Sequence, residues 1–295
     1  MAINFYSFRK LFSRNKKIIY LLEIILKKRY LHGKKRMKKL VLFDKMYNFA
    51  TEKQKKDIIT RYKKYLNEKV KGFPKTTVEI SKLRKFDNRF EVIIQGRNEV
   101  FLQNLIKKEF GTVTDFKDVG IGQEYKGNMI EVGKVGFGIF IDCAILNPRA
   151  DVLLSLHTLR EQLANGKNLS LKEIINAYDF IDKFPMYVKI TEIDTEKNKL
   201  QGIITEKTLT LFKKIRDENI EAVFASGATK NQFKKAIMQK GHFRDIISVK
   251  RYGFLENLVL LKENTNAPGI ISEIGKSLKY CKLNAIRPER IKKFW

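Results

Sequence analysis

The sequence has little of what builds disulfide-bonded, metal-binding or fibrous proteins. Its two cysteines, Cys143 and Cys281, lie far apart and outside any CxxC spacing, and only three histidines are present. We therefore expect neither a disulfide framework nor a Cys/His zinc site. Five prolines and 17 glycines exclude a collagen-like or low-complexity chain. Because 43% of the residues are hydrophobic, the chain can bury a core and is expected to be globular. The two isolated cysteines indicate a reduced, intracellular protein.

Long apolar runs are also lacking. The run at 18–26 has nine residues and is interrupted by Glu23, whereas a spanning helix needs about 20, so no integral membrane association is expected. Unlike in a signal peptide, basic residues follow this run directly. Residues 1–36 carry 11 Lys or Arg against one acid. Three interpretations stay open for this extension: a helix on RNA, an amphipathic helix on a membrane surface, or a start codon assigned too early, with Met37 as the natural start.

Acidic residues are scarce relative to basic ones. The chain has 60 Lys plus Arg against 32 Asp plus Glu, a formal charge of +28, which points to an acidic partner and first of all to nucleic acid. The net charge is +10 for 37–117, −2 for 118–207 and +10 for 208–295. Phosphate contacts supply most salt-dependent affinity, so we expect the two flanking segments to hold an RNA backbone. Plain solvated surface is the other interpretation of these lysines.

Residues 37–117 and 208–295 share one alternation of strand and helix patterns. In both the order is β-α-β-β-α-β, the split βαβ arrangement of ferredoxin-like folds, and a Thr-Glu-Lys-Gln sequence from Thr51 predicts a capped helix start. The expected elements are 39–43, 51–68, 77–83, 90–95, 98–110 and 112–114 in the first segment, and 220–225, 229–240, 246–252, 255–262, 268–280 and 283–286 in the second.

The segment between them, 118–207, has the pattern of a small barrel. Two β-rich runs fill 127–144 and contain Gly133, Gly136 and Gly138. Glycines within strands mark bulges or tight bends, which small barrels need at their corners. Five strands in this arrangement predict an OB-type barrel. The remaining strands are expected at 150–156, 186–194 and 199–205, and an insertion at 157–183 is expected to form helices at 157–164 and 170–182.

The central strands resemble the S1 RNA-binding family of OB folds. In that family two phenylalanines stack on bases with help from a histidine, so the resemblance implies that Phe137 and Phe140 form the stacking pair. The histidine position is Leu153 here, and Gly127 lies about two residues upstream of the family's opening glycine. The fold expected is therefore α+β, an S1-like OB barrel flanked by two ferredoxin-like βαββαβ domains. The stretches that carry the resemblance are Phe-Gly-Ile-Phe-Ile-Asp at 137–142, Val-Leu-Leu-Ser at 152–155 and Val-Lys-Ile-Thr-Glu-Ile-Asp at 188–194.

Three further stretches look like an archaeal family defined only as a domain of unknown function. They are 156–163, 241–245 and 252–256. The resemblance spans Met37 to about Pro288 and implies an archaeal, cytoplasmic protein with an S1-like centre. It implies no activity, and it leaves 1–36 outside, which favours the later start.

Together these patterns predict a cytoplasmic, non-enzymatic RNA-binding protein of translation or RNA processing, without cofactor or metal. Its partner is expected to be RNA or a ribonucleoprotein such as the ribosome. An alternative is an adaptor of the transcription or translation machinery, in which the neutral barrel and inserted helices dock a protein. A third is an RNA-modifying enzyme centred on His242, Arg244 and Asp245, where an acid orients an imidazole. The residues expected to bind RNA are Phe137, Phe140, Lys134, Arg149, His157, Arg160, Lys189, Lys234, Lys235, Arg244, Arg287 and Arg290.

Overall fold

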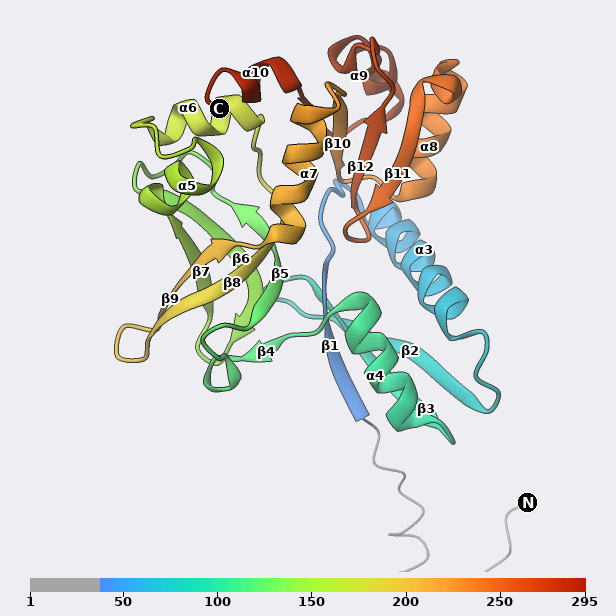
Figure 1. Cartoon of the computed structure of the whole chain (residues 1–295). Helices are drawn as coiled ribbons and strands as arrows, with labels where there is room; N and C mark the ends of the chain where they lie inside the picture. Colours follow the sequence, from blue (N-terminus) through green and yellow to red (C-terminus); the bar gives the residue numbers. More distant parts are fainter. Residues whose placement is uncertain (1–37) are drawn as a thin grey trace, which may run out of the picture.

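Three β-sheets, each with its own helices, make up the computed structural model, which describes residues 38–295 (Figure 1). The basic extension at 1–36 and the alternative start at Met37 lie outside the described residues. The expected fold class is confirmed: a closed five-stranded barrel lies between two mixed α/β units in the chain order. Within 38–295, no helix is both long enough and apolar enough to cross a bilayer.

The first sheet has the antiparallel order β1-β3-β2. Helix α3 starts as the sequence predicts, because the Thr51 hydroxyl accepts a hydrogen bond from the backbone N–H of Gln54 and the Gln54 side chain accepts one from the backbone N–H of Thr51. This reciprocal cap satisfies two of the otherwise unpaired donors of the first turn. The elements are β1 (Lys38–Lys45), α3 (Glu52–Val70), β2 (Thr76–Leu83), β3 (Arg89–Gly96) and α4 (Glu99–Phe110).

The fourth strand of this unit is shared between two sheets. A single bridge joins Leu42 to Thr112, and the N–H of Phe43 donates to the carbonyl of Gly111 at 3.1 Å. The chain thus lies beside β1, where a ferredoxin-like fold places its last strand. It then leaves, and β4 (Thr114–Asp115) pairs in parallel with the barrel strand β6 (Gly138–Leu146). The prediction of one strand at 112–114 is wrong in this detail, because Thr112 pairs with the first sheet and Thr114 already pairs with the barrel.

The barrel closes in the strand order β6-β5-β8-β9-β7, with β7 pairing back to β6. Its pair β7–β9 is parallel and the other pairs are antiparallel, which is the connectivity expected of an OB fold. A short 3-10 turn, η1 (Phe116–Asp118), leads into it. The other barrel strands are β5 (Glu124–Ile130), β7 (Ala150–Ser155), β8 (Pro185–Asp194) and β9 (Lys199–Ile204).

One of the three glycines expected within strands has that place. A Cβ at Gly138 would lie 2.3 Å from the backbone oxygen of Leu154, so only glycine permits this approach of β6 to β7. Gly133 and Gly136 instead lie in the loop between β5 and β6, so the prediction that these two glycines lie within strands is wrong.

The insertion forms two helices, α5 (Leu156–Leu163) and α6 (Leu171–Tyr178). The second is shorter than the predicted 170–182, because Asp179 adopts a left-handed conformation with φ 51° and ends the helix.

The last unit repeats the topology of the first, with the order β11-β12-β10-β13 and every pair antiparallel. Helix α9 ends earlier than the predicted 268–280 and passes into a 3-10 turn at Gly275, a residue with low helix propensity. The elements are α7 (Glu206–Asp217), β10 (Ala222–Ser226), α8 (Lys230–Gln239), η2 (His242–Asp245), β11 (Ile246–Arg251), β12 (Glu256–Leu261), α9 (Ala267–Ile274), η3 (Gly275–Ser277), β13 (Lys282–Ile286) and α10 (Pro288–Lys292).

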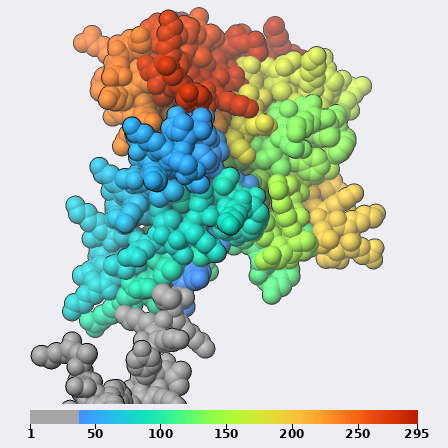
Figure 2. Space-filling model, turned by 180° about the vertical axis from the view of Figure 1, so that it is seen from behind, coloured from blue at the N-terminus to red at the C-terminus, as the bar shows by residue number. Residues whose placement is uncertain are grey.

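Shared cores join the three units. One buried cluster runs from the barrel into the last sheet, where the rings of Phe184 and Phe224 lie 4.9 Å apart. Another joins the last unit to the first, where Phe254 packs edge-on against Tyr62 at 4.7 Å. Seen from behind, the first unit (blue to cyan) touches both the last one (orange to red) and the barrel (green to yellow) (Figure 2). Residues from different units therefore meet in fixed positions.

Candidate functional site

A groove of about 880 Å³ runs along one side of the barrel. We call it the barrel groove. The loop after β5, the strands β6 and β7 and the tip of the β8–β9 hairpin form its walls, and Lys45 of β1 also lines it. Its lining residues are Lys45, Ile130, Glu131, Lys134, Phe137, Phe140, Arg149, Ala150, Asp151, Leu153, Asp182, Lys183, Glu192, Asp194, Asn198, Lys199, Leu200 and Gln201.

Two phenylalanine rings lie in the barrel groove. Phe137 is 55% exposed, and its ring meets that of Phe140 edge-to-face, with centroids 6.0 Å apart and planes at 89°. Gly138 stands between them, and strand pairing sets Phe140 directly opposite Leu153. Because Phe137 is exposed, the protein lacks the stabilisation that burial of this large aromatic side chain would contribute. An exposed aromatic face in a concave site is typical of a surface that binds a flat apolar partner.

The charges of the barrel groove balance: its lining holds five cationic and five anionic side chains. Several are already paired with each other. Lys134 Nζ lies 2.9 Å from a Glu131 oxygen, and Arg149 Nη2 lies 3.4 Å from an Asp151 oxygen. Such a groove offers donors and acceptors beside the aromatic pair, but no net positive field for a row of phosphates.

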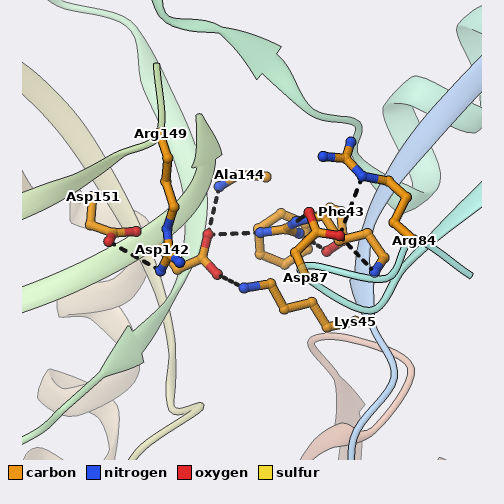
Figure 3. A network of polar contacts seen from close by, with 9 residues as sticks. Phe43, Lys45, Arg84, Asp87, Asp142, Ala144, Arg149 and Asp151 are labelled. Carbon is orange, nitrogen blue, oxygen red and sulfur yellow. Dashed lines mark hydrogen bonds and ion pairs between the residues drawn. The ribbon is translucent and has the colours of Figure 1, made fainter. Parts of the chain in front are cut away.

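Beside the groove, Asp142 ties the first unit to the barrel (Figure 3). Its Oδ1 accepts hydrogen bonds from Arg89 Nη2 at 2.7 Å and from the N–H of Ala144 at 3.0 Å, and its Oδ2 pairs with Lys45. Arg89, only 2% exposed, also donates to the carbonyl of Phe43. We call this set the Asp142 network.

Electrostatics keep Asp142 ionised. Burial by itself would raise the pKa of its carboxyl group, but the guanidinium of Arg89 and the ammonium of Lys45 outweigh burial and lower the pKa to about 2. The Asp142 network therefore holds the end of β1 against β6, and it keeps Lys45 at the side of the barrel groove.

Four of the residues expected to bind RNA come together in the barrel groove: Phe137, Phe140, Lys134 and Arg149. The exposed Lys189 on β8 does not line it. The strand that carries Lys189 was predicted correctly, but Lys189 lies outside the barrel groove.

His157 and Arg160, two of the residues expected to bind RNA, lie on α5 and do not line the barrel groove. His157 Nε2 lies 3.2 Å from Glu161, one turn further along the helix. Arg160 donates from Nε to the carbonyl of Leu169 at 2.6 Å, which ties α5 to the loop before α6. These contacts give both side chains local partners.

The other predicted residues lie on the last unit. Arg290 and Arg287 approach Asp179 to 2.7 and 3.8 Å and so hold α10 near the end of α6. On α8, Lys234 and Lys235 are exposed, and Arg244 is exposed on η2. None of the five lines the barrel groove.

His242 forms a surface cluster with two acids. Its Nδ1 lies 2.8 Å from Asp245 and its Nε2 lies 3.2 Å from Glu273 of α9. The hydrogen bond to Asp245 and the contact with Glu273 raise the pKa of His242. Within 38–295, Arg244 forms no hydrogen bond or ion pair with this cluster, so the structure brings together only two of the three residues of the enzymatic interpretation.

Three parts of the barrel groove were not predicted from the sequence: Lys45, Lys183 and the wall at 192–201. Lys45 reaches Asp142 across 97 positions of the chain. The one available signal was Asp142 itself, a charged residue after a run of apolar strand positions, which indicates a buried ion pair.

Family models match two parts of the chain, the DUF2110 central domain at 119–216 and the DUF2110 C-terminal domain at 220–286. Together the two matches cover more than half of the sequence. The chain belongs to the DUF2110 family. The central domain contains the barrel groove, whereas the sheet of β1, β2 and β3 lies outside both matches. The predicted family resemblance is thus confirmed over 119–286, while an archaeal source and a cytoplasmic location stay predictions.

Several solved structures resemble about 30% of the chain. An uncharacterized protein, MJ1198, from Methanocaldococcus jannaschii is 20% identical, over 30% of this chain and 96% of its own, with a TM-score of 0.21. GSP13 from Bacillus subtilis is 20% identical, over 31% of this chain and 59% of its own, with a TM-score of 0.23. Likenesses at this level carry no argument about function. No curated protein matches the chain.

Proposed function

We propose that this DUF2110 protein binds RNA through unpaired bases held in the barrel groove, and that it acts by binding and not by catalysis. The observation that carries the proposal is the exposed ring of Phe137, set edge-to-face on Phe140 in the barrel groove. Every base has a π-face, so aromatic side chains hold bases of single strands with little sequence preference. Bases within a duplex are stacked and out of reach, so single-stranded RNA is the expected form.

The charge distribution supports bases in the barrel groove and phosphates elsewhere. The groove lining is electrically balanced, whereas 37–117 and 208–295 each carry a net charge of +10. Lys234 and Lys235 are exposed on α8. Contacts between such lysines and the phosphates of RNA provide salt-dependent affinity without sequence preference.

Replacing both Phe137 and Phe140 with alanine tests the proposal. Each stacked base contributes about 1–3 kcal/mol, so affinity for a short single-stranded RNA is expected to fall by at least about tenfold, measured by fluorescence anisotropy. The number of ion contacts is unchanged, so the slope of affinity against salt is expected to stay the same. Phe101→Ala is the matched control, because Phe101 is 61% exposed on α4, outside the barrel groove.

Two results would contradict the proposal. Wild-type protein that fails to bind RNA, or binds it independently of salt, would exclude it. A double variant with wild-type affinity would show that the barrel groove does not hold bases, and would favour the adaptor interpretation.

A further inference from the structure

A second hollow lies where the three units meet. It has a volume of about 430 Å³ and is lined by α3, the end of α4, β5, the start of α8 and the turn between β11 and β12. These elements converge near the middle of the molecule (Figure 1). We call it the junction hollow. Its lining includes four cations and two acids: Lys69, Lys126, Lys230, Arg251, Asp44 and Glu109.

The two acids of the junction hollow already have partners. Glu109 pairs with Lys69 at 2.7 Å. Asp44, 5% exposed, accepts hydrogen bonds from the Tyr62 hydroxyl at 2.9 Å and from the N–H of Phe254 at 3.3 Å. By contrast, no carboxylate of residues 38–295 lies within 4.0 Å of the charged atoms of Lys126, Lys230 or Arg251. Three cations from two different units are thus unneutralised around one concavity.

Aromatic rings hold two of these cations. The guanidinium of Arg251 lies 4.2 Å from the ring centroid of Tyr65, and Lys126 Nζ lies 5.0 Å from that of Phe43. Stacking on a ring fixes the plane of a guanidinium and leaves its N–H fork available. The Nε atom of Arg251 is buried and has no hydrogen-bond partner within 38–295. A buried donor without a partner costs folding free energy.

We propose that the junction hollow binds a phosphate group. Gathering three like charges costs free energy through repulsion, and a multiply charged tetrahedral anion offsets it at one place. An arginine fork together with two lysine point charges suits phosphate oxygens. The phosphate belongs either to RNA, in which case the inference rests on the proposed function, or to a free phosphorylated compound, in which case it does not.

The test compares the full-length protein with the double variant Lys126→Gln/Arg251→Gln. Calorimetry with inorganic pyrophosphate and anisotropy with single-stranded RNA at several salt concentrations are the two measurements. If the phosphate is a free one, pyrophosphate binds the wild type and binds the double variant about tenfold more weakly or worse. If it belongs to RNA, the slope of RNA affinity against salt falls by about 1 for each cation removed.

Controls make each outcome decisive. Lys172→Gln removes an exposed lysine of α6 outside the junction hollow and is expected to change neither measurement. If loss of the Arg251 stack prevents folding, Lys126→Gln/Lys230→Gln replaces the first variant, with thermal melting as the check. Unchanged pyrophosphate affinity together with an unchanged salt slope overturns the inference, as does a wild type that binds neither probe. If the wild type binds pyrophosphate but not RNA, and the Phe137→Ala/Phe140→Ala variant still binds pyrophosphate, the proposed function is overturned and this inference stands.

Discussion

Replacing Asp142 with alanine is expected to destabilise the protein by about 3–5 kcal/mol, because it leaves a buried cation without its partner. The Arg89 side chain is only 2% exposed and its Nη2 lies 2.7 Å from Asp142. Lys45 loses the same partner. The free energy of unfolding in urea, followed by far-UV circular dichroism, measures the effect.

Two further variants separate this cause from a general loss of packing. Glu196→Ala removes an exposed acid from the β8–β9 turn and is expected to change stability by less than about 0.5 kcal/mol. Asp142→Leu/Arg89→Met removes the buried guanidinium together with its partner and leaves only Lys45, whose side chain is 21% exposed, so it is expected to be milder than Asp142→Ala. An Asp142→Ala protein within about 1 kcal/mol of the wild type would mean that Arg89 regains water, and that the Asp142 network does not hold the units together.

Glu256→Gln is expected to stabilise the protein by up to about 3 kcal/mol at pH 8 and to have little effect near pH 4. Glu256 is buried, accepts a hydrogen bond from the Tyr47 hydroxyl at 2.5 Å and faces Asp44 and Lys126. Burial, and then repulsion by Asp44, raise the pKa of its carboxyl from 4.5 to about 7. Glutamine keeps an oxygen that accepts from Tyr47 and carries no charge to bury.

The pH window follows from the two pKa values of Glu256, 4.5 in the unfolded protein and about 7 in the folded one. Below 4.5, both the folded and the unfolded protein hold the Glu256 proton, so the group contributes nothing to pH dependence. Between 4.5 and about 7, only the folded protein still holds it, and stability falls as pH rises. Above about 7 the loss is complete.

Urea unfolding at pH 4, 6 and 8 measures the difference between Glu256→Gln and the wild type. Glu196→Gln, at an exposed position, is expected to show the same small difference at each pH. A Glu256→Gln difference that does not grow with pH would show that Glu256 is ionised within the folded protein at neutral pH.

Much of the fold follows from local patterns. Alternating apolar residues predicted the barrel strands and the β-α-β-β-α-β order of both flanking units, and the Thr51 cap predicted the start of α3. Two helices were predicted too long: Asp179 ends α6 in a left-handed conformation, and α9 passes into a 3-10 turn at Gly275. The crossing of one strand from the first sheet into the barrel has no local signature at all.

Part of the candidate site was equally accessible. The resemblance of the Phe-Gly-Ile-Phe stretch to the S1 family pointed to Phe137 and Phe140, and both line the barrel groove. The predicted basic contacts were less successful: Arg160, Arg287 and Arg290 have partners within the protein. A count of charges does not say which of them the fold neutralises.

The sequence by itself determined the elements, the two kinds of unit and the aromatic pair, since each depends on neighbours within a few positions. Only the tertiary structure decided which charges are paired and which remain available to a ligand. Arg89 meets Asp142 across 53 positions and Tyr47 meets Glu256 across 209, and such contacts exist only once three separate units have packed. The Asp142 network and the junction hollow lie at those contacts, where burial and a few ångströms of separation set the charge of each group.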